Sequence, residues 1–122
     1  DIARLVYKND KKLSGGLEVN IIGNNEMKKI NNQYRGINKT TDVLSFAWQE
    51  DGVLKADFLG QIYICYPKIK KQAKEFGVSI KEEFNRILIH GLLHLIGYDH
   101  VAKKESKKMF DLQEKILKEI VI

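Results

Sequence analysis

With 122 residues, this chain is long enough for one domain with its own hydrophobic core, and its single cysteine excludes an internal disulfide. No apolar run approaches the ~20 residues that a membrane-spanning helix needs, and no signal-peptide pattern opens the sequence, so we expect a cytoplasmic protein with no membrane partner. The 21 Lys and Arg residues against 16 Asp and Glu give a net charge of +5, which favours polyanionic partners such as RNA, although lysines mixed with glutamates are also typical of a solvated surface.

The N-terminal part of the chain contains one clear pattern. Residues 2–8 are too few to classify, and a polar loop follows them. Leu17, Val19 and Ile21 then alternate with polar side chains, which predicts a half-buried strand over residues 17–23.

The middle of the chain predicts a helix and two strands. Asn24 or Asn25 can cap a helix that runs to about residue 35 and ends at Gly36. Alternating side chains predict a strand over residues 42–48. Another strand is predicted over residues 58–65, and because it carries little charge we place it at the centre of a sheet. Its last residue, the cysteine, is expected to be buried and not to act as a nucleophile.

Three helices are predicted for the second half. Pro67 suits the first turn of a helix that runs to about residue 76. Ser79 begins a capping box, which opens a helix over residues 80–96, and the last helix covers residues 102–120, with an apolar stripe that indicates core packing. Strands that alternate with helices imply an α/β or α+β fold with a partly parallel sheet, in a single domain over residues 1–122 whose N-terminus we expect to be truncated.

All three histidines of the chain fall within the twelve residues 89–100. His90 and His94 are four residues apart, so an α-helix places both imidazoles on one face, about 6 Å apart along its axis. Gly97 can leave the helix through a left-handed conformation and let His100 turn back toward the same ion. Three imidazoles and one open position are typical of a catalytic zinc site, although nickel, cobalt and copper also bind such a set.

The spacing of these histidines is that of a long zincin motif with one change. Gly91 stands where that motif carries its general-base glutamate. A glycine inside a helix costs about 1 kcal/mol relative to alanine, so another requirement must favour it. Two explanations are open: space for a bulky substrate group, or close packing against a neighbouring strand.

Four segments of the sequence resemble the YbeY family of bacterial metal-dependent endoribonucleases, which are linked to ribosomal RNA maturation. The most specific is His-Gly-Leu-Leu-His-Leu-Ile-Gly-Tyr-Asp-His at residues 90–100, and the others lie at residues 30–36, 41–46 and 59–64. The resemblance covers about residues 17–117. The family usually carries aspartate where Gln61 stands, on a strand that we expect to lie near the site.

The resemblance implies a mixed sheet of about four strands surrounded by helices, and one Zn²⁺ per chain held by His90, His94 and His100. It further implies that Arg35 is a catalytic residue that acts on the substrate phosphate, whereas the residues alone favour a simpler role as a cation at a helix C-terminus. The implied activity is a single-strand-specific, zinc-dependent endoribonuclease in 16S ribosomal RNA 3′-end maturation and ribosome quality control. Its implied partners are ribosomal RNA and the ribosome, with ribosomal proteins as further candidates.

Two other functions stay open at this point: a zinc hydrolase of amides or peptides, and a non-catalytic module that binds RNA at the ribosome. No general base is assigned. Exposed lysines could steer an RNA backbone and aromatic side chains could stack bases, although each aromatic residue is as readily explained as core. The candidates for these two roles are Lys68, Lys70, Lys71 and Lys74 for steering, and Tyr34, Phe46, Trp48 and Tyr98 for stacking.

Overall fold

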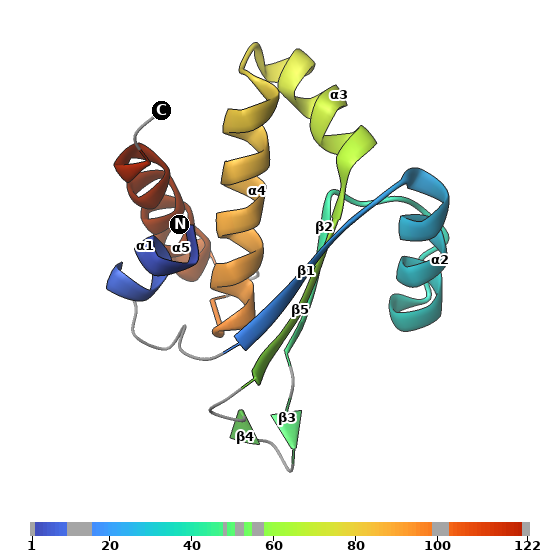
Figure 1. The fold of residues 1–122 in the computed structure, drawn as a ribbon, viewed down its shortest axis with the longest axis horizontal. Helices are drawn as coiled ribbons and strands as arrows, with labels where there is room; N and C mark the ends of the chain where they lie inside the picture. Colours follow the sequence, from blue (N-terminus) through green and yellow to red (C-terminus); the bar gives the residue numbers. More distant parts are fainter. Residues whose placement is uncertain are drawn as a thin grey trace.

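The computed structural model describes residues 2–9, 16–47, 49–50, 53–54, 58–98 and 103–120. Its elements follow one another in the order α1 (Ile2–Asn9), β1 (Gly16–Ile22), α2 (Asn24–Arg35), β2 (Val43–Ala47), β3 (Gln49–Glu50), β4 (Val53–Leu54), β5 (Phe58–Cys65), α3 (Tyr66–Phe76), α4 (Ile80–Leu95) and α5 (Lys103–Glu119). Figure 1 shows a small sheet with α4 along one face and α2 beyond the other, and with α1 and α5 packed outside α4. Among these residues, no helix is both long and apolar enough to cross a membrane.

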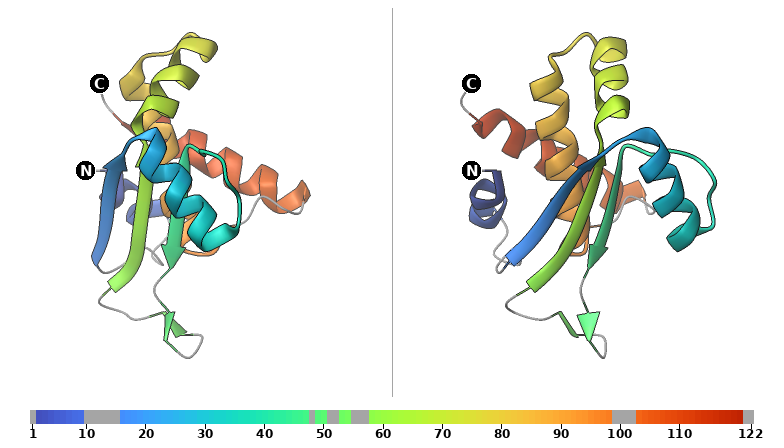
Figure 2. Two further views of the ribbon diagram at one scale, coloured as in Figure 1. Left: turned by 90° about the vertical axis from the view of Figure 1, so that its right-hand side faces the viewer. Right: turned by 45° about the vertical axis from the view of Figure 1, so that its right-hand side comes forward.

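The main sheet is mixed, as predicted, and β5 lies at its centre. Its order is β1-β5-β2, with β1 parallel and β2 antiparallel to β5, which Figure 2 shows in two further views. The described part of this sheet has three strands where about four were expected, and β3 and β4 form a separate pair. The low charge of β5 is explained by its place between two neighbours, with helices packed on both faces.

A bulge near the start of β5 depends on Gly60. The pairing of β1 with β5 shifts between Gly16 and Leu17, and Gly60 has φ 151°, a value that side-chain-bearing residues rarely adopt. A Cβ atom at Gly60 would overlap the carbonyl oxygen of Phe46 and lie 2.8 Å from Cδ1 of Leu95. Glycine is therefore required where β5 passes between β2 and α4.

The predicted helices form with nearly the predicted bounds. Gly36 ends α2 at φ 69°, and Ser79 caps α4 by accepting a 3.0 Å hydrogen bond on Oγ from the Glu82 amide. One predicted cap is wrong: the N-cap of α2 is Gly23, not an asparagine, and no side chain caps this end. Residues 2–8, which the sequence left unclassified, belong to α1, whose Val6 is fully buried.

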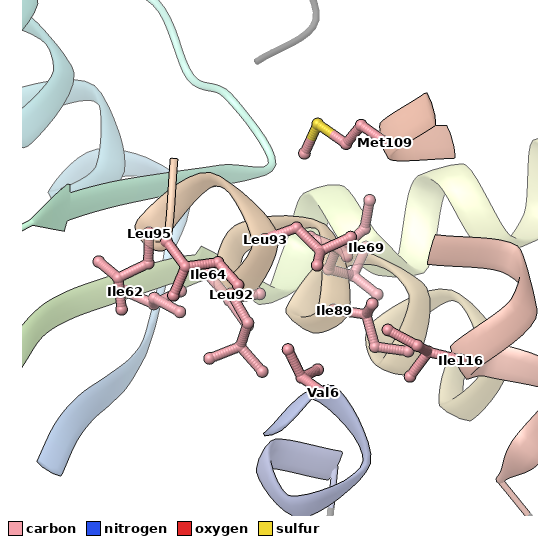
Figure 3. Close-up of a cluster of buried hydrophobic side chains, with 12 residues drawn as sticks. Val6, Ile62, Ile64, Ile69, Ile89, Leu92, Leu93, Leu95, Met109 and Ile116 are labelled. Carbon is pink, nitrogen blue, oxygen red and sulfur yellow. The ribbon is translucent and has the colours of Figure 1, made fainter. Parts of the chain in front are cut away.

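The core divides into two clusters on opposite faces of the sheet. The larger one joins α1, β5, α3, α4 and α5, and Figure 3 shows its side chains converging between these elements. The smaller one lies under α2 and contains Ile22, Met27, Leu44 and Cys65. The prediction that the cysteine is buried is thereby confirmed. Each fully buried aliphatic side chain contributes about 1.5–3 kcal/mol, so the larger cluster dominates stability.

The prediction that the apolar side chains of β1 form its buried face is only partly correct. Leu17 packs against the larger cluster, but Val19 is 39% and Ile21 59% exposed, although both lie on the same face of the sheet. The reason is that α4 packs against β2 and β5, so it does not cover the outer half of β1. Ile22, on the other face, is buried beneath α2.

Candidate active site

The C-terminal half of α4 carries two of the three predicted metal ligands. His90 and His94 are both half-buried, and their ring centroids lie 4.7 Å apart with the ring planes inclined by 75°. The third predicted ligand, His100, lies outside the described residues. Within the described part of the chain, no three His, Cys, Asp or Glu side chains are grouped so that they could hold a metal ion. The structure therefore supplies two adjacent imidazoles on one helix face.

Gly97 ends this helix as the sequence predicts. Its φ is 107°, its amide donates to the carbonyl of His94 at 3.1 Å, and the Tyr98 amide donates to the carbonyl of Leu93 at 3.0 Å. These bonds satisfy carbonyl groups that the last turn of the helix would leave without partners. The helix thus ends at Leu95, and the chain changes direction at Gly97, three residues after the second histidine.

Gly91 lies between the two histidines and faces the sheet. A Cβ atom here would lie 3.1 Å from Cγ2 of Val43, 3.2 Å from Oγ of Ser45 and 3.3 Å from Cγ2 of Ile62. Ser45 Oγ also donates a 2.9 Å hydrogen bond to the carbonyl oxygen of Gly91. Of the two explanations that the sequence left open, the structure supports close packing of α4 against β2 and β5.

We expect Gly91→Ala to lower the free energy of unfolding by about 1–3 kcal/mol, because overpacking outweighs the roughly 1 kcal/mol gain in helix propensity. Ile62 is fully buried and β-branched, so it cannot move aside easily. Urea unfolding measures the effect. Val43→Ala removes one of the crowded atoms, so a double-mutant cycle should show that the two changes together cost less than their sum. A more stable Gly91→Ala protein would show that helix propensity dominates.

A pocket of about 600 Å³ connects the histidines to α2 and β2. Its lining comprises Arg35, Thr41, Asp42, Val43, Leu44, Ser45, Phe46, His90 and His94. Arg35 is the last residue of α2 and is exposed, so its guanidinium is accessible from solvent. Segments that lie about fifty residues apart in the sequence thus place the predicted arginine and two predicted histidines around one space.

Aromatic rings extend from this pocket along the face of the sheet that α2 covers. The rings of Tyr34 and Phe46 have centroids 5.1 Å apart, and those of Phe46 and Tyr63 have centroids 5.9 Å apart. Tyr34 is 63% exposed, so it does not belong to the core. Tyr98, another predicted stacking residue, packs against the larger core cluster, and Trp48 lies outside the described residues.

Asp42 is a pocket residue to which the sequence assigned no role. One carboxylate oxygen accepts from Oγ1 of Thr41 at 3.5 Å and the other from Nε2 of Gln72 at 3.4 Å. Its carbonyl oxygen accepts a 2.9 Å bond from the Cys65 amide, which fixes its backbone to the end of β5. The sequence signal that could have identified Asp42 was the Thr-Asp pair at the start of the segment at residues 41–46, which resembles the family.

The strand that carries Gln61 lies near the site as expected, since Ile62 packs against Gly91, but Gln61 itself does not line the pocket. Its Nε2 donates to a carboxylate oxygen of Glu18 on β1 at 3.3 Å, and its Oε1 accepts from the hydroxyl of Tyr63, also at 3.3 Å. Alternation along β5 directs Gln61 to the face covered by α2, opposite to α4. The exchange of aspartate for glutamine here therefore changes a residue that pairs with the pocket-lining Phe46 in the register of β2 with β5.

The imidazole of His90 is anchored by α5, which sequence reasoning missed. Its Nδ1 lies 2.7 Å from Oε1 of Gln113, a side chain that is only 6% exposed. The signal was a polar residue at helical spacing between the buried Met109 and Ile116. With Nδ1 engaged in this contact, Nε2 of His90 is the nitrogen suited to a metal ion, and the described residues supply two of the three imidazoles that the sequence predicts for a zinc site.

Comparison with known proteins gives consistent similarities. Residues 2–121 match a family model described as Endoribonuclease YbeY. Proteins named Endoribonuclease YbeY from Malacoplasma penetrans and Bacillus licheniformis are 48% and 44% identical, each over 83% of this chain and over 67% and 69% of their own lengths. The solution structure of TM1509 from Thermotoga maritima is similar with a TM-score of 0.67 and 35% identity, covering 97% of this chain and 77% of that one.

Proposed function

Because this chain belongs to the Endoribonuclease YbeY family, we propose that it is a zinc-dependent endoribonuclease that cleaves single-stranded RNA and matures the 3′ end of 16S ribosomal RNA. The observation that carries the proposal is the pocket in which Arg35 meets His90 and His94. An arginine and a metal-binding pair around one space suit the hydrolysis of a phosphodiester, whose reaction develops negative charge on the phosphate oxygens.

We assign the metal ligands to His90, His94 and, from the sequence spacing, His100. The contact between His90 and Gln113 supports this assignment, because a ligating imidazole normally uses its second nitrogen to hold a neighbouring group. When bound, a zinc ion supplies Lewis acidity, which polarises a phosphoryl oxygen and makes water more acidic.

Arg35 binds the scissile phosphate in this proposal. Its planar guanidinium offers two parallel N–H donors to two phosphate oxygens. The left-handed Gly36 ends α2 immediately after it, so the side chain extends from the last turn of the helix. Arg35 therefore orients the phosphate and stabilises the charge that forms during cleavage.

The exposed ring of Tyr34 and the pocket-lining ring of Phe46 support single-stranded RNA as the substrate. Unpaired bases stack on such rings, whereas a duplex keeps its bases stacked internally. Lys70, Lys71 and Lys74 are exposed on α3, but they do not line the pocket. Steering of an RNA backbone by these lysines remains a prediction.

An amide or peptide hydrolase is a weaker candidate for this pocket. Zincin proteases carry their general base at the position of Gly91. A Cβ atom at this position would lie only 3.1 Å from Val43 and 3.2 Å from Ser45, so there is no room for a carboxylate that could reach a substrate. The zincin spacing of the histidines is thus shared without the group that peptide hydrolysis requires.

The proposal is tested by cleavage of a labelled single-stranded RNA that contains the 16S ribosomal RNA 3′ end. We expect the zinc-loaded protein to cut this RNA, to lose activity after chelation and to regain it when zinc is restored. DNA of the same sequence and an RNA hairpin should be cut far more slowly. A His94→Ala protein purified in parallel detects contaminating nuclease, and equal cleavage by both proteins would contradict the proposal.

A further inference from the structure

We infer that Gln113 is a positioning residue that selects the tautomer of His90, and that an ion pair between Arg86 of α4 and Glu114 of α5 fixes the orientation of the Gln113 amide. The inference concerns the metal site of the proposed function and rests on that proposal for its consequence. The residues involved form one continuous path from α4 through α5 and back to α4.

The path begins at His90 and ends at Arg86, one helical turn earlier on α4. Gln113 lies 2.7 Å through Oε1 from Nδ1 of His90, and its Nε2 donates to Oε2 of Glu114 at 3.2 Å. The carboxylate of Glu114 accepts from Arg86 through both oxygens, at 3.1 Å from Nε and at 3.4 Å from an Nη atom. Every group on this path is buried or half-buried, so water competes weakly for its hydrogen bonds.

Arg86 holds the far end of the path in place. It also donates to Glu83, which is 2% exposed, at 2.9 Å and to Glu82 at 3.3 Å. Burial lowers the pKa of Arg86, but hydrogen bonds to Glu114 and Glu83 raise it by more, so the pKa lies above its usual value. Stabilisation that depends on this charge is therefore complete below the pKa of the unfolded chain and is lost only at higher pH. The guanidinium remains a fixed cation throughout the working range.

The direction of each hydrogen bond follows from this fixed cation. A carboxylate paired with a guanidinium can only accept, so the amide group of Gln113 must present its NH₂ to Glu114. Its carbonyl oxygen must then face His90, and a carbonyl oxygen can only accept. Nδ1 of His90 is therefore the protonated nitrogen, and Nε2 keeps the lone pair that a metal ion requires.

As a consequence, the metal-free protein already holds His90 in the tautomer that can bind a metal ion through Nε2. A neutral imidazole without this constraint populates both tautomers, and only one of them presents an unprotonated Nε2. Partners of this kind typically change metal affinity about 10–100-fold. Gln113 thus acts on the proposed reaction through His90, without contact with the substrate.

Gln113→Leu tests the first step, because leucine fills similar space without an acceptor. In the metal-free protein at alkaline pH, nitrogen NMR of the imidazoles should show His90 of the parent as a single tautomer protonated on Nδ1. In Gln113→Leu we expect both tautomers, and competition with a chromophoric chelator should show zinc affinity lowered about 10–100-fold. An unchanged tautomer with zinc affinity within about twofold of the parent would overturn the inference.

Glu114→Gln tests the second step and decides the matter if Gln113→Leu fails to fold. This change lets the amide of Gln113 turn over, so we expect the tautomers of His90 to mix again. The double variant Gln113→Glu with Glu114→Gln restores an acceptor toward His90 and a hydrogen bond between positions 113 and 114, while the amide oxygen at 114 keeps one of the two bonds from Arg86. It should recover the single tautomer and the parental zinc affinity, and a folded double variant that recovers neither would refute the path.

These readouts separate this inference from the proposed function. Tautomer and zinc affinity are measured without RNA, so a protein that shows the expected changes but cleaves no RNA would contradict only the nuclease proposal. A protein that cleaves RNA while His90 keeps one tautomer in both single variants would contradict only the role of Gln113.

Discussion

Replacing Arg35 with alanine is expected to lower kcat for RNA cleavage by about 10²–10³-fold, the usual cost of losing a donor that stabilises transition-state charge. The zinc content and the thermal unfolding temperature should stay at parental values, because Arg35 is exposed and contacts the pocket rather than either core cluster. Single-turnover cleavage of a labelled RNA, with metal analysis of the same preparation, measures both quantities.

Two matched variants sharpen this experiment. Lys29→Ala removes another exposed cation from α2 that does not line the pocket, so it should change kcat less than about twofold. Arg35→Lys keeps the charge but loses the planar pair of donors, and we expect it to recover only a part of the lost rate. An Arg35→Ala protein that cleaves at the parental rate would remove this residue from the mechanism.

His94→Ala should abolish zinc binding and RNA cleavage together. The change removes one of the two described imidazoles, and two remaining ligands cannot hold zinc in a catalytic site, which needs three. We expect cleavage to fall by on the order of 10³-fold or more, because the Lewis acid contributes several kcal/mol. Metal analysis after dialysis and the RNA assay check the two losses independently.

The Arg35→Ala protein is the matched control for His94→Ala, since Arg35→Ala should lose cleavage but retain zinc. Circular dichroism should show an unchanged helix content for His94→Ala, because His94 is half-buried and lies outside the core clusters. Zinc bound at parental affinity by His94→Ala would show that the histidines are not the metal site.

Local sequence patterns predicted most helices and strands well, but they did not predict which side chains other elements cover. The bounds of β5 follow from a segment with little charge, and the end of α2 at Gly36 follows from a residue that tolerates a positive φ. The exposure of Ile21 could not be predicted, because it depends on where α4 crosses the sheet. The helix α1 was missed because eight residues are too short for its periodicity to be distinguished.

The candidate site was predictable where its residues are close in sequence. The spacing of His90 and His94 fixes their proximity on one helix face, whatever the fold. Arg35 came from the family resemblance, since a lone arginine at a helix end carries no sign of a pocket. Gln113 and Asp42 reach the site only through the packing of α5 and β2, which are contacts between distant segments that periodicity cannot show.

The division of the core into two clusters has a consequence for motion. Local opening of a structure needs the free energy of the contacts that it breaks, and α2 is held mainly by the smaller cluster around Met27. The helix α4 instead lies against α1, α3, α5 and the sheet. Amide hydrogens of α2 should therefore exchange with solvent faster than those of α4. In such an opened state Arg35 would leave the pocket while both histidines remain in place, so the proposed phosphate contact would be released without disturbing the proposed metal ligands.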